Sequence, residues 1–395
     1  MYNLLLSGYL SDLAEEPAKW LTIGILGALL LVYLIMLFAH LIAKLIGNEV
    51  FAKKCLCHSN KFIKSAGIGF VFYALALGIF LLVAEIMKKF DTAYLDENWV
   101  SLDVVSHVLI PLLATLVITL IGGITLFVLS KTKPEKVKPA LAIFGILLGV
   151  CLIITLVLIG VHFTKNISND GYYSEEINPS ALYIGAIAVI VFTVITAFIL
   201  GKKDKKPFDT HSIALAGICV ALSFALSYIK LWDMPTGGSI TLVSLLPVML
   251  FAYIYGTKKG LLIGFLYGIL QAVQDPWLIH PAQFLLDYPI AFSMVCFAGM
   301  LSDLNVLNKV PQVKFGISAA IGGAFRFLCH VLSGVFAFGA YAVDAGATDF
   351  WVYSLAYNSY VFIDIALVIV AGCIILSSKA FNRQIEKLNP KNDLS

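Results

Sequence analysis

One carboxylate, Asp287, stands about one turn inside an apolar stretch that is long enough to cross a bilayer. A charged group is costly there, and ionisable residues in such segments usually face a cavity or a partner group. Asp287 is therefore a candidate functional residue. Its carboxylate can bind a cation or accept hydrogen bonds from a ligand.

Further polar and aromatic residues occur near the ends of the neighbouring apolar stretches. His330, Gly334 and Phe338 are spaced by four residues, which places them on one face of a helix. The others are Tyr228, Trp232, Tyr267, Gln271, Gln274, Trp277, Gln283, Tyr288, Tyr353, Tyr357 and Asn358. Rings offer stacking and cation–π faces, and His and Asn offer directional hydrogen bonds. Together these residues predict a cavity for a small aromatic, cationic or hydrogen-bonding ligand.

Each of these residues also has a simpler interpretation. Trp and Tyr at helix ends commonly form a belt at the membrane surface, and Gly on a helix face commonly serves close packing. A single histidine such as His330 is commonly a hydrogen-bonded packing residue. Their joint occurrence at one depth of several helices favours a binding site.

Arg326 and Asp364 lie deeper in their apolar stretches. At a rise of ~1.5 Å per residue, their depths differ by about 6 Å, a distance that an arginine side chain can reach across. We expect a structural ion pair between them rather than ligand contacts.

The composition shows what kind of protein must position these side chains. Of 395 residues, 60% are hydrophobic and 13% are charged, about half the share of roughly 25% that is usual in soluble domains. A soluble core cannot hide that much apolar surface, which excludes a soluble enzyme, a secreted disulfide scaffold and a disordered protein. The net charge of +3 does not indicate nucleic-acid binding.

The sequence predicts an all-α integral membrane protein with about eleven transmembrane helices, since only helices satisfy the backbone within an apolar stretch of this kind in lipid. The expected spans are 21–47, 66–87, 106–130, 141–163, 181–201, 211–230, 239–256, 260–273, 284–302, 315–341 and 353–377.

The connections between these spans alternate between basic and acidic. The first holds Lys53, Lys54, Lys61 and Lys64, and the second holds Asp91, Asp96, Glu97 and Asp103. Because Lys and Arg accumulate on the cytoplasmic side, this alternation predicts a multi-pass protein of the cell membrane with its N-terminus outside and its C-terminus in the cytoplasm.

A basic segment around 201–209 divides the chain into two parts of different character. Residues 1–205 form a predicted membrane domain of five helices with few polar groups in its spans, and its role is open. Residues 206–395 form a predicted six-helix domain with a cytoplasmic tail and with many Gly, aromatic and polar residues. The second domain is the expected place of function.

Several chemistries lack their sequence signatures. The chain has no G-x-x-x-x-G-K-[S/T] phosphate loop, no H-E-x-x-H and no G-x-S-x-G motif. We therefore expect neither an ATPase nor an enzyme nucleophile, and we expect no cofactor. Cys55, Cys57 and His58 leave a metal site open as an alternative, but zinc sites usually take four ligands at recognisable spacing.

Five segments carry a resemblance to a known family. They are Gly237-Gly-Ser-Ile-Thr-Leu-Val-Ser-Leu-Leu-Pro247, Tyr255-Gly-Thr-Lys-Lys-Gly260, Gln283-Phe-Leu-Leu-Asp-Tyr-Pro-Ile-Ala-Phe292, His330-x-x-x-Gly334 and Tyr353-Ser-Leu-Ala-Tyr-Asn358. Through them, residues 210–380 resemble the thiamine-specific substrate-binding (S) component of energy-coupling factor (ECF) transporters. The resemblance implies a six-helix bundle that binds thiamine near the outer face. It also implies a separate coupling transmembrane subunit and two ATPase subunits as partners.

The resemblance also implies roles for individual residues. Asp287 is the carboxylate that bonds the pyrimidine of thiamine, and Phe338 is the stacking ring. The remaining expected contacts are Tyr288, His330, Gly334, Tyr353, Asn358, Trp277, Tyr267 and Trp232. Two departures from the family pattern leave a thiamine precursor or analogue open, because the family expects Glu in place of Asp287 and Trp in place of Phe338.

The family further implies a contact surface of small residues for the coupling subunit. Gly217, Ala221 and Ala225 present such a face at a spacing of four residues, and ordinary packing within the chain is the alternative. The first five helices are not part of the resemblance. They are interpreted as an accessory domain, a docking module or a scaffold.

Two other functions remain open from the sequence. A self-sufficient secondary transporter of thiamine, a precursor or another small aromatic cation would need an ion pathway, to which Asp287 and Asp364 could belong. A membrane enzyme or receptor would need its activity in the first five helices, and the lack of clustered His, Asp or Glu in their spans argues against an enzyme.

Overall fold

The computed structural model describes residues 2–89, 110–166, 179–201, 208–235, 237–275, 277 and 280–388. The predicted domain boundary at 205/206 lies outside these residues. The acidic second connection, with Asp91 and Asp103, also lies outside them, as do the first residues of the expected span 106–130.

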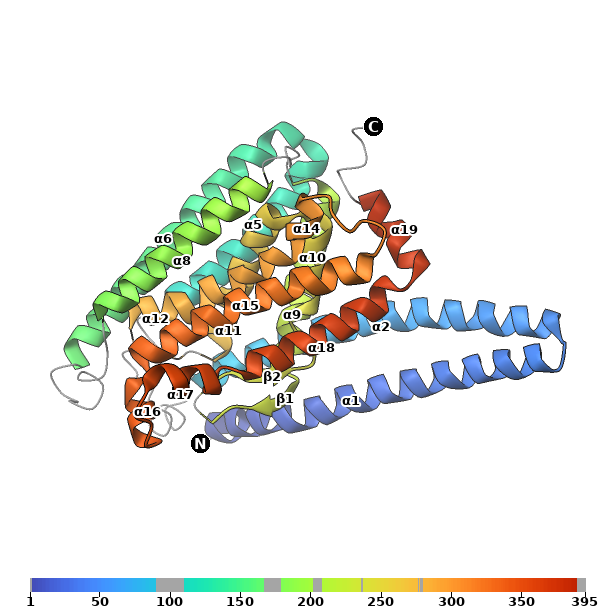
Figure 1. The fold of residues 1–395 in the computed structure, drawn as a ribbon, viewed down its shortest axis with the longest axis horizontal. Coiled ribbons are helices and arrows are strands. Elements are labelled where there is room, and N and C mark those ends of the chain that lie inside the picture. Colours follow the sequence, from blue (N-terminus) through green and yellow to red (C-terminus); the bar gives the residue numbers. More distant parts are fainter. Residues whose placement is uncertain are drawn as a thin grey trace.

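The first half of the chain consists of long helices. They are α1 (Tyr2–Leu45), α2 (Glu49–Lys89), α5 (Ile110–Thr132), the 3-10 turn η2 (Pro134–Lys136), α6 (Val137–Asn166) and α8 (Pro179–Leu200). α1 and α2 form an antiparallel hairpin whose closed end extends well beyond the other helices (Figure 1). α1 has 44 residues, or about 66 Å at ~1.5 Å per residue, so only part of it can lie within a hydrocarbon core of ~30 Å.

The second half contains shorter and more irregular elements. In chain order they are α9 (Thr210–Ser227), β1 (Lys230–Asp233), β2 (Ser239–Thr241), α10 (Leu246–Tyr255), α11 (Thr257–Gln274), α12 (Pro281–Leu285), the π-helical turn η4 (Leu286–Ile290), α13 (Ala291–Ser293), the 3-10 helix η5 (Met294–Gly299), α14 (Met300–Asp303), α15 (Pro311–Ala337), α16 (Gly339–Asp344), α17 (Phe350–Tyr357), α18 (Tyr360–Leu376) and α19 (Lys379–Leu388).

The fold is that of an all-α integral membrane protein with one short β-hairpin. Within the described residues, eight helical segments are long and apolar enough to cross a membrane, and α10 is a shorter apolar helix. The structure therefore confirms the predicted fold class, while the count of eleven spans is not confirmed.

The expected span 239–256 is wrong in its first third. Ser239–Thr241 form strand β2, which pairs antiparallel with β1, and the helix begins only at Leu246. Gly237 and Gly238 have φ angles of 95° and 88°, which favour glycine and allow the chain to turn back between the strands. The expected span therefore began too early, at the second strand of this hairpin, and the helix starts seven residues later at Leu246.

The helical segment from Pro281 to Asp303 changes its winding several times. Pro289 lies inside the π-helical turn η4 and has no backbone N–H to donate to the preceding turn. Such π-helical turns are often found at functional sites. This one contains Asp287, the carboxylate singled out by the sequence.

α11 approaches this irregular segment through a row of glycines. A Cβ atom at Gly264 would lie 3.0 Å from the Cα of Ser293, and one at Gly268 would lie 2.6 Å from the carbonyl oxygen of Tyr288. The absence of side chains at these positions allows two helical backbones to pack in direct contact. α11 thus forms one firm wall behind η4.

The helices of the first half pack directly against the second half. Leu112 of α5 and Ile159 of α6 share a buried cluster with Phe284. Leu182 and Ala186 of α8 are buried in another cluster. That cluster includes Ala282, Leu286, Ile290, Met294, Phe297 and Cys329 of the second half. Figure 1 shows α6 and α8 running alongside α12 and α15. The two predicted domains therefore share parts of their hydrophobic cores.

Candidate ligand-binding site

A cavity of about 140 Å³ lies between α11, η4, α15, α17, α18 and the β-hairpin. By the same measure, a single water needs on the order of 10–15 Å³, so the cavity can receive part or all of a small organic molecule. Eight of the ten ligand contacts implied by the resemblance line it: Trp277, Asp287, Tyr288, His330, Gly334, Phe338, Tyr353 and Asn358. The structure brings these residues together at one cavity, and their contact with a ligand stays a prediction.

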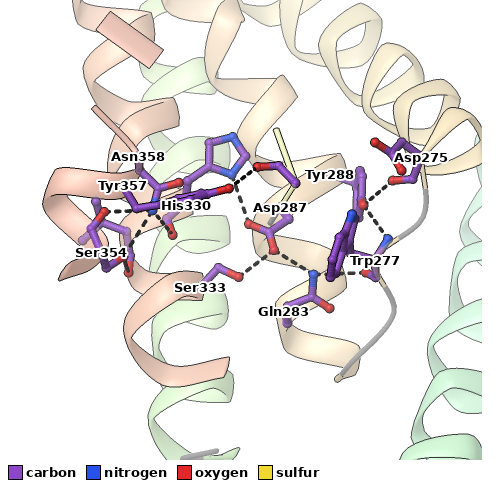
Figure 2. A network of polar contacts seen from close by, with 12 residues as sticks. Asp275, Trp277, Gln283, Asp287, Tyr288, His330, Ser333, Ser354, Tyr357 and Asn358 are labelled. Atoms are coloured by element: carbon purple, nitrogen blue, oxygen red, sulfur yellow. Dashed lines mark hydrogen bonds and ion pairs between the residues drawn. The ribbon is translucent and has the colours of Figure 1, made fainter. Parts of the chain in front are cut away.

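The Asp287 carboxylate is held by side chains from two elements (Figure 2). Its Oδ2 accepts hydrogen bonds from Gln283 Nε2 at 2.7 Å and from Ser333 Oγ at 2.6 Å. Its Oδ1 lies 3.0 Å from His330 Nδ1. These partners are a carboxamide, a hydroxyl and an imidazole. The carboxylate is thus fixed in position with its negative charge available to a ligand.

His330 connects Asp287 to α17. With Nδ1 donating to the carboxylate, the other ring nitrogen of a neutral imidazole is an acceptor. That atom, Nε2, is buried and has no hydrogen-bond partner among the described residues. On the opposite side, Asn358 Nδ2 donates to the backbone oxygens of His330 at 3.4 Å and of Ser354 at 2.9 Å.

Gly334 allows α17 to approach α15. A Cβ atom there would collide with the Ser354 hydroxyl and lie 3.3 Å from Asn358 Nδ2. The Ser354 hydroxyl in turn donates to the backbone oxygen of Val331 at 3.0 Å. Any larger residue at position 334 would displace the helix that carries Asn358 from the cavity.

Aromatic rings cover another part of the cavity wall. Trp277, Phe338 and Tyr341 form a three-ring cluster with centroid distances between 5.9 and 6.4 Å. Tyr353 and Tyr357 stack on α17 with their centroids 6.1 Å apart. Such faces are suited to a flat or cationic group.

The short segment before α12 is tied to the site by hydrogen bonds. Tyr288 OH donates to the backbone oxygen of Asp275 and accepts from the backbone N–H of Trp277. Gln283 Nε2 also donates to the backbone oxygen of Trp277 at 3.1 Å. The backbone of Trp277 is thereby tied both to α12, through Gln283, and to η4, through Tyr288.

His280 caps the N-terminus of α12. Its Nδ1 accepts the N–H of Ala282 at 3.2 Å, and its own N–H points to Gln283 Oε1 at 3.5 Å. Burial lowers the pKa of His280 from 6.5 to about 4. The imidazole is therefore neutral at physiological pH, as a cap that accepts a hydrogen bond requires.

The predicted ion pair between Arg326 and Asp364 is confirmed, with Arg326 Nη1 and Asp364 Oδ2 3.2 Å apart. Asp364 Oδ1 also accepts from Thr241 through its N–H and its hydroxyl. The Arg326 guanidinium lies over the ring of Phe292 at 4.9 Å. Both charged residues line the deep end of the cavity, so they are closer to the site than the sequence indicated.

Two predicted contact residues do not line the cavity. Tyr267 is fully buried behind Phe292, with its hydroxyl directed toward the backbone oxygen of Ser223 at 3.4 Å. Trp232 lies on β1, just beyond the outer end of the expected span 211–230, and is 65% exposed. The depth of a residue along a helix did not reveal which way these rings point.

The structure adds two residues of the site that the sequence did not single out. Tyr341 completes the three-ring cluster from the short helix α16, and Ser333 donates to Asp287 without lining the cavity. Ser333 follows His330 by three residues, which is one helical turn and is the one signal that could have indicated it.

The three small residues of the proposed partner surface differ in exposure. Ala225 is buried within the chain, Ala221 is half-buried and Gly217 is exposed. Nothing lies within 4 Å of a Cβ placed at Gly217. Within this row, the end near Gly217 is accessible to another helix, whereas the end at Ala225 serves internal packing.

Part of the chain is similar to known proteins. Residues 213–384 match the family described as thiamine transporter protein (Thia_YuaJ). The thiamine transporter ThiT of Bacillus subtilis (strain 168) is 35% identical over 134 residues, which cover 32% of this chain and 68% of that protein. The thiamine transporter ThiT of Lacticaseibacillus paracasei is 30% identical over 172 residues, which cover 40% of this chain and 83% of that protein. No solved structure matches the chain significantly.

Proposed function

The chain belongs to the thiamine transporter protein family, and we propose that it captures thiamine in the cavity around Asp287. The observation that carries this proposal is the position of the Asp287 carboxylate, which is fixed by three side chains at the wall of a cavity lined with aromatic rings.

The chemistry of thiamine fits these groups. Thiamine has an aminopyrimidine that can stack and donate hydrogen bonds, a positively charged thiazolium ring and a hydroxyethyl group. The Asp287 carboxylate accepts from the amino group and attracts the cation. The cluster of Trp277, Phe338 and Tyr341 provides ring faces. His330 Nε2, which lacks a partner among the described residues, accepts a donor of the ligand.

The remaining roles follow from the positions of the lining residues. Tyr353 and Asn358 contact the ligand from α17 and its C-terminal end. Gly334 allows α17 to pack closely against α15. Tyr288 holds the segment of Trp277 in place. None of these groups performs covalent chemistry in this scheme, so the protein acts as a transporter rather than as an enzyme.

Uptake needs a source of energy, and we infer that separate subunits supply it. In this scheme the chain is the substrate-binding component of an ECF-type transporter, with a coupling transmembrane subunit and two ATPase subunits as partners. The lack of a phosphate-loop motif in the sequence supports this inference.

Thiamine binding to the purified full-length protein tests the site. We expect thiamine to quench tryptophan fluorescence and to raise the melting temperature. Asp287→Asn should weaken binding at least tenfold, because hydrogen bonds to a charged group contribute about 1.5–3 kcal/mol. Glu135→Gln, on the distant turn η2, is the control and should bind as the wild type does. Unchanged binding by Asp287→Asn would refute the proposed site.

A self-sufficient secondary transporter is the second candidate. Its support is that Asp287 and Asp364, two carboxylates within membrane-length helices, line one cavity. Liposomes that contain this chain alone separate the two functions. Thiamine accumulation driven by an imposed proton or sodium gradient would support the secondary transporter, whereas binding without accumulation would support dependence on other subunits.

A further inference from the structure

We propose that α8, a helix of the first half of the chain, positions the ligand-binding carboxylate through a contact between Tyr183 and His280. The inference rests on the proposed function of the cavity and assigns a role to the first half, which lies outside the matched residues 213–384. Tyr183 is a positioning residue in this scheme and does not touch the ligand.

The short helix that leads to Asp287 lies between the cavity and α8. Its cavity side carries Gln283 and Asp287, which are bonded to each other. Its other side carries Ala282 and Leu286, which are fully buried against α8 residues Leu182 and Ala186. α8 therefore forms the back wall of the helix that carries the carboxylate.

Tyr183 extends this wall to the beginning of α12. Its ring meets the ring of His280 edge to face, with a centroid distance of 4.9 Å and an interplanar angle of 65°. This is a favourable geometry for an aromatic pair. His280 is almost completely buried, and the Tyr183 ring contacts the imidazole that caps α12.

From His280, a short series of hydrogen bonds leads to the carboxylate. The backbone N–H of His280 points to Gln283 Oε1, and Gln283 Nε2 donates to Asp287 Oδ2. The same Nε2 donates to the backbone oxygen of Trp277, which carries one of the cavity rings. Gln283 is itself fully buried. The His280 ring accepts the N–H of Ala282, so a shift of this ring disturbs the first turn of α12, whose Gln283 orients both Asp287 and Trp277.

Loss of the Tyr183–His280 ring pair should weaken ligand binding because it loosens the first turn of α12. Without Tyr183, the first turn of α12 can relax in the free protein, and ligand binding must then restore its order. That ordering reduces the observed affinity without removing any ligand contact. A purely structural role would instead lower the melting temperature and leave the affinity of the folded protein unchanged.

Thiamine titration of purified full-length variants tests the proposal. Tyr183→Ala should weaken binding roughly two- to tenfold, the range expected for one aromatic pair. Tyr183→Phe keeps the ring and should bind within twofold of the wild type. Ile184→Ala is the matched control, since Ile184 is the next residue of α8 and is 69% exposed. It should bind as the wild type does.

A double-mutant cycle tests the route through His280. His280→Asn keeps a side chain that can cap α12 and removes the ring. The combined variant Tyr183→Ala, His280→Asn should bind no more weakly than His280→Asn alone, because both changes break the same contact. Additive losses, or wild-type affinity in Tyr183→Ala, would overturn the proposal.

The same titrations distinguish this inference from the proposed function. If the wild type binds no thiamine, or if Asp287→Asn binds as tightly as the wild type, the proposed site itself is refuted. If both behave as expected while Tyr183→Ala binds normally, the role of α8 alone is refuted.

Discussion

The ion pair between Arg326 and Asp364 is the most deeply buried charge pair described at the cavity. Both side chains are almost inaccessible, and Asp364 receives two further hydrogen bonds from Thr241 of the β-hairpin. Removing one partner of such a pair leaves a buried charge without compensation, whereas replacing both partners by apolar residues is often tolerated. The pair thus links α15, α18 and the hairpin at the deep end of the site.

Arg326→Met should therefore destabilise the protein by about 3–5 kcal/mol. The double variant Arg326→Met, Asp364→Leu should recover a large part of this loss, because no unpaired charge remains. Thermal unfolding of both variants in the same detergent measures the difference. A double variant that is as unstable as the sum of the single variants would show that the two charges do not act as a pair.

At the level of single residues, the sequence predicted rare polar groups better than aromatic ones. Asp287 and His330 stood out because polar groups are scarce in membrane-length helices, and the structure places them 3.0 Å apart. Tyr267 was expected in the site from its depth and from the family resemblance, yet it is fully buried in the core. Tyrosine is suited to a core, a membrane surface or a binding site, so its position along a helix does not fix its surroundings.

Among the helices, α11 shows most clearly how close packing supports the site. Its Gly268 lies directly against the backbone of Tyr288 and Pro289 in η4. A methyl group at this position must push the two backbones apart, and η4 carries Asp287.

Gly268→Ala should lower the melting temperature and weaken thiamine binding. Gly149→Ala on α6 is the matched control, because nothing lies within 4 Å of a Cβ placed at Gly149. Alanine favours helices more than glycine does, so the control should be neutral or slightly stabilising. Equal melting temperatures for the two variants would contradict the importance of this contact.

The cap of α12 predicts a dependence of stability on pH. Burial in the folded protein lowers the pKa of His280 to about 4 from its ordinary value of 6.5. The folded chain therefore favours the neutral imidazole. Its contribution is fully present above pH 6.5 and is lost as the pH falls toward 4.

His280→Asn retains a capping oxygen that does not titrate in this range. We expect the melting temperature of the wild type to fall relative to this variant between pH 6.5 and 4. The wild type and the variant contain the same other titrating groups, so the difference between their melting temperatures in one buffer series reports on His280. Parallel melting curves over this range would contradict the role of the neutral histidine.

The prediction of elements was most successful for long, uniformly apolar helices. The expected spans 181–201 and 353–377 correspond to α8 and to α17 with α18. The hairpin at 230–241 was missed because its strands have only four and three residues, too few to show a clear strand pattern. The π-helical turn at Asp287 was also not foreseen, since its winding depends on packing against α11 and α8 as well as on Pro289.

For the whole molecule, the sequence predicted two parts but not their contact. The Leu- and Ile-rich spans of the first half gave no indication of which faces meet the second half, because those helices are apolar on every side. The structure shows that Leu112, Ile159, Leu182 and Ala186 supply shared cores. Such faces are determined by shape, which hydropathy does not describe.

The predicted orientation of the chain can be tested at Cys57. This residue is exposed on α2, near Lys53, Lys54 and Lys61, and it should face the cytoplasm if the N-terminus is outside. A membrane-impermeant maleimide should therefore label it in inverted vesicles and not in intact cells. Cys57→Ser identifies the signal of this residue. Labelling of Cys57 in intact cells would contradict the proposed orientation and indicate the opposite one.

The packing of α8 behind α12 also has a consequence for how the protein is made. Chains enter the membrane from their N-terminus, and early parts assemble first. α8 is therefore inserted before any residue of the cavity has left the ribosome. The helix of Asp287 then meets a wall that already exists, and the cavity closes only when α17 and α18 arrive near the end of synthesis. The order of the two halves along the chain gives the site a support to fold against.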